Sequence, residues 1–151
     1  LSGSADALRQ AIQATPEDAN LLILYGVVVQ QMGDAAAAEQ AWQQARELLG
    51  GAEAPFLAER GLAFLQAQQP EAALADLETA VALDPTSART HLLLGSALET
   101  MGRVQEALAA YEQAATLAEA AGNSELVAVA RVQAANLMQR MQFSPPTTPQ
   151  P

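Results

Sequence analysis

Residues 54–87 read APFLAERGLAFLQAQQPEAALADLETAVALDPTS, and residues 88–121 read ARTHLLLGSALETMGRVQEALAAYEQAATLAEAA. The two segments share a pattern that also occurs in a third segment starting at Ala19: a Gly, then a small residue, then a large residue. These are Gly26, Ala38 and Trp42 in the first copy, Gly61, Ala73 and Leu77 in the second, and Gly95, Ala107 and Tyr111 in the third. A repeat of about 34 residues is typical of stacked helix-turn-helix units.

The composition suits thin layers of closely packed helices. Half of the 151 residues are hydrophobic, but only 4% are aromatic. No apolar run approaches the ~20 residues of a membrane span, and the first ten residues lack the pattern of a secretory signal. We therefore expect an all-α fold: a right-handed superhelix, or α-solenoid, of antiparallel helix pairs with about eight helices in one domain, residues 1–142.

The negative net charge limits the kinds of partner that we expect the chain to bind. The net charge is −10, from 17 acidic and 7 basic residues, and there is no Cys. Because phosphates and anionic membranes attract Lys and Arg clusters, we expect neither a nucleic-acid partner nor direct membrane contact. The lack of Cys excludes a disulfide and a thiolate zinc site.

Turn and cap signals set the boundaries of the elements. The sequence Thr15-Pro16-Glu17-Asp18 predicts a helix start, with Thr15 as the N-terminal cap and Asp18 reaching back to it. Pro70 is placed to begin a helix. The predicted helices are 6–14, 19–32, 35–48, 54–67, 70–83, 88–101, 104–120 and about 125–142.

The two ends depart from the repeat. Residues 4–18 match only the second half of a repeat, and the chain starts without Met; both indicate a fragment or processed product, with a repeat, linker or membrane anchor upstream. Residues 1–4 are expected to be frayed. Residues 123–142 predict a capping helix with one buried face, whose opposite, polar face holds Glu125, Gln133, Asn136, Gln139 and Arg140.

On these residues the chain resembles the tetratricopeptide repeat family, with full repeats at 19–53, 54–87 and 88–121. The resemblance covers nearly the whole chain, since Gly and Ala recur where the family has small residues. It implies a concave groove, lined by the first helix of each pair, that binds a peptide or a partner's helix. The groove residues implied are Asn20, Ile23, Val27, Gln30, Gln31, Ala58, Leu62, Leu65, Gln66, Arg89, Leu92, Ser96, Glu99 and Thr100.

The implied groove has an apolar floor and an amide or hydroxyl rim, which fits an apolar peptide or an amphipathic helix. The alternative is that several of the apolar residues pack against the next repeat and meet no ligand. The family's clamp for chaperone C-terminal carboxylates is missing most of its residues. The places of its Lys and first Asn are taken by Ile23 and Val27. The places of its second Asn and its Arg are taken by Glu59 and Leu93. At the matching places, only Arg89 is basic.

The Pro/Thr-rich tail, Phe143 to Pro151, favours an extended conformation. We expect it to lie in the groove of its own chain or of a neighbour, with an adventitious contact as the alternative.

No pattern of catalysis is present. His91, the only His, falls at the large-residue place of a repeat, which predicts a structural role. Glu17 with Asp18 and Asp76 with Glu78 are interpreted as helix-start and surface charges rather than acid/base pairs. We expect no enzyme activity, no cofactor and no metal.

The function predicted is a protein-interaction scaffold or adapter, active in assembly or biogenesis of a larger complex. A self-assembling structural protein and the soluble part of a membrane-tethered assembly factor are the alternatives, and a homo-oligomer would suit the first of these. The sequence leaves the partner and the compartment open.

Overall fold

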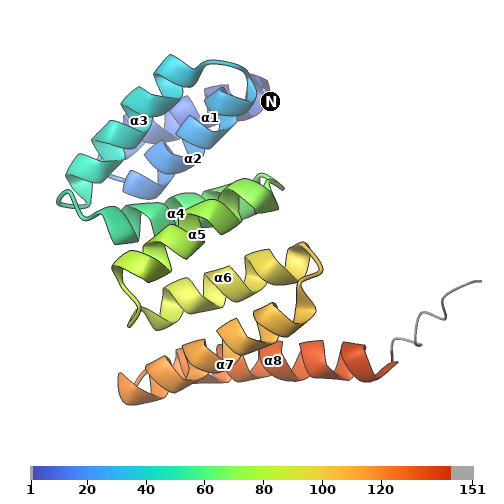
Figure 1. The fold of residues 1–151 in the computed structure, drawn as a ribbon. Helices are drawn as coiled ribbons and strands as arrows, with labels where there is room; N and C mark the ends of the chain where they lie inside the picture. Colours follow the sequence, from blue (N-terminus) through green and yellow to red (C-terminus); the bar gives the residue numbers. More distant parts are fainter. Residues whose placement is uncertain (1, 144–151) are drawn as a thin grey trace, which may run out of the picture. The chain divides into compact units, whose positions relative to one another are not determined.

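The computed structural model describes residues 2–143, and all regular structure within that range is α-helix. The helices are α1 (Ser2–Ala14), α2 (Ala19–Gln31), α3 (Ala35–Leu48), α4 (Glu53–Gln66), α5 (Pro70–Leu83), α6 (Ala88–Thr100), α7 (Val104–Ala120) and α8 (Ser124–Phe143). The all-α prediction is confirmed, and α2–α3, α4–α5 and α6–α7 form antiparallel pairs (Figure 1). None of the described helices is long and apolar enough to cross a membrane.

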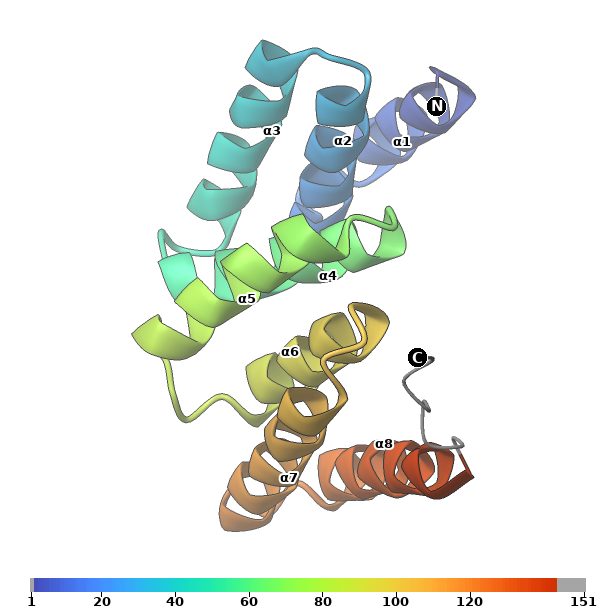
Figure 2. The same ribbon diagram turned by 45° about the vertical axis from the view of Figure 1, so that its right-hand side comes forward.

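The described helices form two compact units: unit 1 is α1–α5, up to Pro85, and unit 2 is α6–α8, from Thr86. Within unit 1, α2 contacts α1, α3 and α4, and α4 also contacts α5 (Figure 2). Within unit 2, α7 contacts both α6 and α8. The single domain over residues 1–142 stays a prediction.

The recurring Gly lets the two helices of each pair approach closely. A Cβ built on Gly26 would lie 2.2 Å from Trp42 Nε1, which donates a 3.2 Å hydrogen bond to the carbonyl of Ile23. The equivalent distances are 2.6 Å from Gly61 to Leu77 Cγ and 2.6 Å from Gly95 to the Tyr111 ring. Since real Cβ atoms do not approach neighbours this closely, each large residue occupies space that only a Gly leaves open.

The caps differ in part from the sequence prediction. Asp18, not Thr15, is the N-terminal cap of α2, because its carboxylate accepts from the amides of Asn20 and Leu21. Thr15 instead donates to the carbonyl of Ala11 at the end of α1. The prediction for Pro70 is confirmed, since it lies in the first turn of α5.

The helix ends also differ slightly. Helix α1 begins at Ser2, so residues 2–4, which were predicted to be frayed, belong to the helix. Helix α8 extends to Phe143, one residue beyond the prediction. Residues 144–151, the rest of the predicted tail, lie outside the described residues, as does Leu1.

A charged pair lies inside unit 1 among aromatic rings. Arg60 in α4 bonds both carboxylate oxygens of Asp76 in α5, and their side chains are 17% and 11% exposed. The guanidinium carbon of Arg60 is 4.7 Å from the ring centroid of Trp42 and 5.1 Å from that of Phe56. The interpretation of Asp76 as a surface charge is therefore wrong: position on a helix cannot reveal a cation on the neighbouring helix.

Candidate functional site

Three of the predicted groove residues lie in the core. Ile23, Val27 and Ala58 are 1%, 0% and 5% exposed. Their helices are covered within unit 1, where α2 contacts three other helices. These three side chains are buried, as the alternative of packing between repeats expects, and the groove itself stays a prediction. A charge at Ile23 would unfold the protein rather than test binding.

The remaining predicted residues reach the surface to different extents. Exposed are Asn20, Gln30, Gln66, Arg89 and Thr100; half-buried are Gln31, Leu62, Leu65, Leu92, Ser96 and Glu99. Several of the polar side chains already have partners within the chain, Gln31 and Thr100 among them. Gln31 Nε2 donates a 3.2 Å bond to the carbonyl of Ala67, and the Thr100 hydroxyl donates to the carbonyl of Ser96.

Glu99 joins the three helices of unit 2. Its Oε2 accepts a 2.7 Å hydrogen bond from the Tyr111 hydroxyl in α7, and its Oε1 accepts from Arg140 in α8. Burial raises the pKa of Glu99, but the hydrogen bonds from Tyr111 and Arg140 outweigh it and the net pKa is lowered. Burial, followed by the bond to Glu99, raises the pKa of Tyr111. Glu99 therefore holds α8 in place, which leaves little of its carboxylate for a ligand.

A hollow of about 330 Å³ lies between α6 and α8 in unit 2. Its lining is Arg89, Leu92, Leu93, Asn123, Glu125, Leu126 and Val129. Leu92 forms part of the hollow while also packing against Ala114, Ala115 and Ala130. Two predicted groove residues, Arg89 and Leu92, thus lie at a concave surface that is apolar along one wall and polar at its rim.

The contribution of α8 to this hollow was missed by the groove prediction. Val129 stands at the place where the three full repeats have Gly, and it is 41% exposed. In those repeats the second helix of the pair covers this place, whereas no second helix follows α8 within the described residues. The exchange of Gly for Val was the signal that could have identified this wall.

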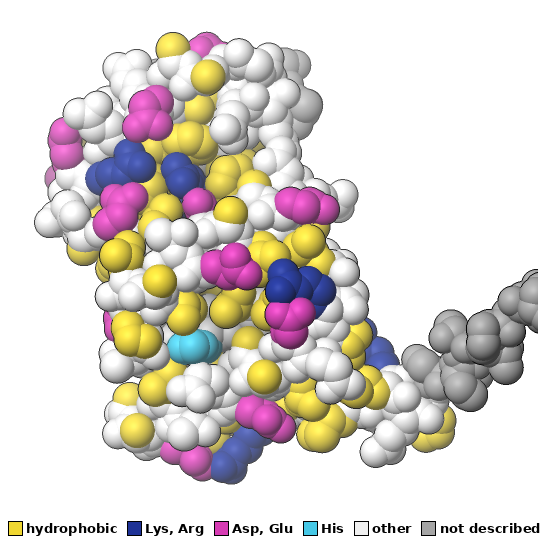
Figure 3. Space-filling model, viewed as in Figure 1, with side chains coloured by type: hydrophobic (Ala, Val, Ile, Leu, Met, Phe, Trp, Pro, Cys, Tyr) yellow, Lys and Arg dark blue, Asp and Glu magenta, His cyan; other side chains and the backbone are white. Residues whose placement is uncertain are grey.

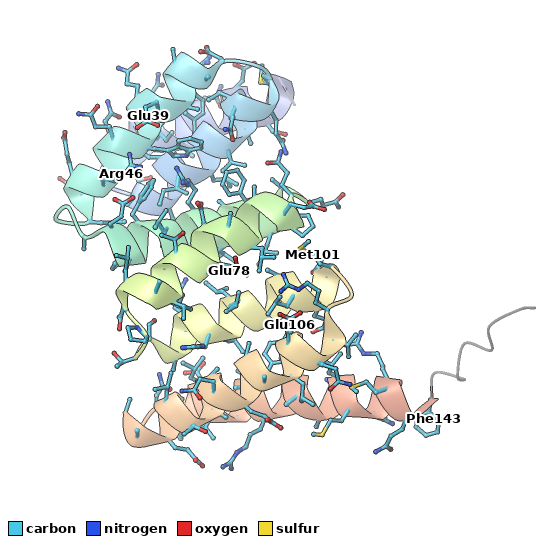
Figure 4. All side chains as sticks on the ribbon, viewed as in Figure 1. Glu39, Arg46, Glu78, Met101, Glu106 and Phe143 are labelled. Carbon is cyan, nitrogen blue, oxygen red and sulfur yellow. The ribbon has the colours of Figure 1, made fainter. Side chains whose placement is uncertain are left out.

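The outer face of α8 is less polar than predicted. Val132, Met138 and Phe143 are 56%, 41% and 77% exposed. Phe143 projects from the end of the helix (Figure 4). The capping helix has one buried face, at Ala130, Ala134 and Leu137, but the rest of its surface mixes apolar and polar side chains.

The side chains that could hold a metal ion are spread out over the described part of the chain. His91 is half-buried and has an interaction partner, and its imidazole reaches the surface (Figure 3). Among the described residues, no three His, Asp or Glu side chains are grouped to hold a metal ion. Figure 3 shows acidic side chains spread over this face with apolar patches between them.

Residues 59–124 match the model of the tetratricopeptide repeat family. A curated relative, serine/threonine-protein phosphatase T of Trypanosoma brucei brucei, strain 927/4 GUTat10.1, is 35% identical over 95 residues. The match covers 60% of this chain and 20% of that enzyme. The chain therefore spans about one fifth of the length of the curated relative that it matches.

Solved structures share the fold at low sequence identity. A T3SS complex from Aeromonas hydrophila has a TM-score of 0.62 at 20% identity, covering 92% of this chain and 85% of that chain. The TPR2B domain of yeast Sti1, in a complex with a pHsp70 partner, has a TM-score of 0.61 at 19% identity, covering 81% and 97%. These similarities establish a common helical-repeat fold.

Proposed function

This chain is a tetratricopeptide repeat protein, and we propose that it is an adapter that binds a protein or peptide partner through the hollow between α6 and α8. The observation that carries the proposal is the hollow itself, of about 330 Å³, with Leu92, Leu93, Leu126 and Val129 along its wall. Hollows of roughly 300 Å³ or more accommodate a bulky group, and polar atoms at the rim can orient it. A Leu or Phe side chain of the partner would fill this space.

The size of the hollow sets the expected strength of binding. Burying one large apolar side chain contributes about 1.5–3 kcal/mol. That is too little for tight binding, which needs about 8 kcal/mol for a micromolar complex. The partner therefore makes further contacts outside the hollow.

A chaperone C-terminus is a poor candidate for the partner. The yeast Sti1 domain is described in a complex with pHsp70, but here Ile23 and Val27 stand at clamp places and are buried. A carboxylate at those places would meet no donor side chain, and its desolvation would be uncompensated. An apolar peptide or an amphipathic helix suits the wall better, and assembly of a larger complex is the role that such an adapter would serve.

The two exposed valines of α8 provide the test. Val129 lines the hollow, whereas Val132 lies on the same helix, is more exposed and is not part of the lining. Peptides of about 15 residues, selected from a random display library on the wild-type chain, should carry a bulky apolar residue. Their affinity should fall at least about tenfold with Val129→Asp, the loss of one buried apolar contact, and stay unchanged with Val132→Asp. Equal binding to all three proteins would exclude the hollow.

Self-association is the second candidate, favoured by the exposed Val132, Met138 and Phe143 on α8. Exposed apolar side chains on a surface helix can take part in contacts between proteins. Light scattering over a concentration series distinguishes the two functions. An adapter stays monomeric without its partner, whereas a self-assembling protein increases in mass with concentration and loses that increase with Val132→Asp.

A further inference from the structure

A second hollow, of about 200 Å³, lies within unit 1 between α1, α2 and α3. Apolar side chains, including Ile12, Leu22 and Ala41, form its floor. Polar groups stand at its rim: Arg9, Tyr25, Gln40 and Gln44. No residue of this hollow belongs to the predicted groove or to the hollow between α6 and α8, so its chemistry stands apart from the proposed function.

Comparison of the first two repeats shows what this hollow lacks. Tyr25 and Ala41 occupy the places that Arg60 and Asp76 occupy one repeat later. In the later repeat, the Asp76 carboxylate accepts 2.6 and 2.8 Å bonds from Arg60. In the first repeat, Ala41 lines the hollow and supplies no carboxylate.

A cation is nevertheless present at this place. It comes from α1, where Arg9 Nη2 donates a 3.2 Å bond to the Tyr25 hydroxyl and the guanidinium carbon lies 5.8 Å from the Tyr25 ring centroid. Among the described residues of the lining, Arg9 is the only Lys, Arg, Asp, Glu or His side chain. The described lining of the hollow thus has a guanidinium, from α1, and no carboxylate.

We propose that this hollow binds an acidic side chain, Asp or Glu, of a peptide partner. The carboxylate would accept from Arg9 and from the side-chain amides of Gln40 and Gln44. These two side-chain amides make no hydrogen bond with the described part of the chain. Because the volume is below the ~300 Å³ of typical small-molecule pockets, it suits one side chain rather than a cofactor.

Two electrostatic effects oppose this binding, and both are weak: the ion pair between Asp6 and Arg9, and the negative net charge of the chain. Asp6 bonds Arg9 at 3.1 Å, but both side chains are more than half exposed, and such pairs exchange readily for another carboxylate. The net charge of −10 repels an acidic peptide at long range. That repulsion is screened beyond about 8–10 Å at physiological salt.

The test uses two acetylated and amidated 11-residue peptides of Ala, Ser and Gln that differ only in a central Glu or Gln. NMR titration of the labelled protein follows the Arg9 Nε–Hε and the Gln40 and Gln44 side-chain amide signals. We expect the Glu peptide to bind about fivefold tighter, in keeping with one exposed charge pair. Equal affinity of the two peptides, or shifts confined to α6 and α8, would overturn the proposal.

Two variants assign the effect to this hollow. Arg9→Gln should remove the preference for Glu, whereas Arg131→Gln, which neutralises an exposed Arg of unit 2, should keep it. Ala41→Asp would supply a carboxylate from within the chain. The affinity of this variant for the Glu peptide should fall to its affinity for the Gln peptide. Preference retained in Arg9→Gln would contradict the proposal even if Ala41→Asp did not fold. Val129→Asp leaves this titration unchanged, so failure here is distinguishable from failure of the adapter hollow.

Discussion

The guanidinium of Arg60 and the carboxylate of Asp76 form a two-point ion pair, with Nε 2.6 Å from Oδ2 and Nη2 2.8 Å from Oδ1. The pair links α4 to α5, and the rings of Trp42, Phe56 and Phe64 lie within 5.9 Å of the guanidinium carbon. Since water has little access, neither charge can be left alone without a desolvation cost.

Asp76→Ala should therefore lower the free energy of unfolding by about 3 kcal/mol, because an unpaired guanidinium would remain among the rings. Urea unfolding followed by circular dichroism measures this change. Glu71→Ala, in the exposed first turn of the same helix, is the control and should change it by at most about 0.5 kcal/mol. The double variant Arg60→Met, Asp76→Leu should recover most of the loss, because it leaves no buried charge.

Gly95 provides a test of the close helix packing. A Cβ there would lie 2.6 Å from two carbons of the Tyr111 ring, so Gly95→Ala should destabilise the protein by roughly 1–2 kcal/mol, and Gly95→Leu by up to about 3, through overpacking. The matched control is Gly3→Ala in α1, where nothing lies within 4 Å of the added Cβ. That variant should gain up to about 1 kcal/mol from helix propensity alone. Melting temperatures that rise in both variants would contradict the packing argument.

The spacing of the repeat predicted the helix pairs and their Gly contacts because close approach requires a missing Cβ, a requirement visible in residue type. Burial of Ile23 and Val27 could not be predicted in the same way. It depends on which helices cover α2, and the same positions would be exposed if α4 lay farther away. The role of Asp76 likewise depends on Arg60, which lies 16 positions away in the sequence.

The two hollows were harder still to predict. The wall at Val129 depends on two facts. Val stands at the place of the recurring Gly, which is visible in the sequence. No described helix follows α8 to cover that place, which is visible only in the structure. At the hollow beside Arg9, Ala41 stands where the next repeat has Asp76. The exchange of Asp for Ala could be interpreted only after the structure showed the ion pair between Arg60 and Asp76.

Gln68 adopts a backbone conformation that favours Gly. Its φ is 58°, whereas the other described residues with positive φ are all Gly, among them Gly33 and Gly102 in the turns of the neighbouring pairs. A side chain in this region costs about 1 kcal/mol, partly offset by the greater freedom of Gly in the unfolded chain.

Gln68→Gly should consequently stabilise the protein by about 0.5–1 kcal/mol, measured as the shift in the urea midpoint at constant m-value. The reverse change, Gly102→Gln, should cost a similar amount, since it introduces the same strain at φ 73°. A lower midpoint for Gln68→Gly would mean that the Gln68 side chain makes a contact that outweighs the strain.

Acid should weaken unit 2 through Glu99. The folded pKa of Glu99 is lowered below its ordinary value of 4.5, because the bonds from Tyr111 and Arg140 favour the ionised form more strongly than burial opposes it. A lowered folded pKa means that the unfolded chain binds the proton more readily. The stabilisation from Glu99 is therefore complete above the unfolded pKa and is lost as the pH falls through the folded pKa.

Glu99→Gln removes this carboxylate, so its unfolding free energy should vary less between about pH 5 and pH 3 than that of the wild type, and its stability should be lower at pH 7. Because Arg140 and Tyr111 both bond Glu99, hydrogen exchange at pH 7 should quicken first in α8. Glu112→Gln, an exposed site on α7, is the control and should leave both the exchange of α8 and the acid dependence close to wild type. Parallel acid profiles for wild type and Glu99→Gln would show that the three-helix network contributes nothing to the pH dependence.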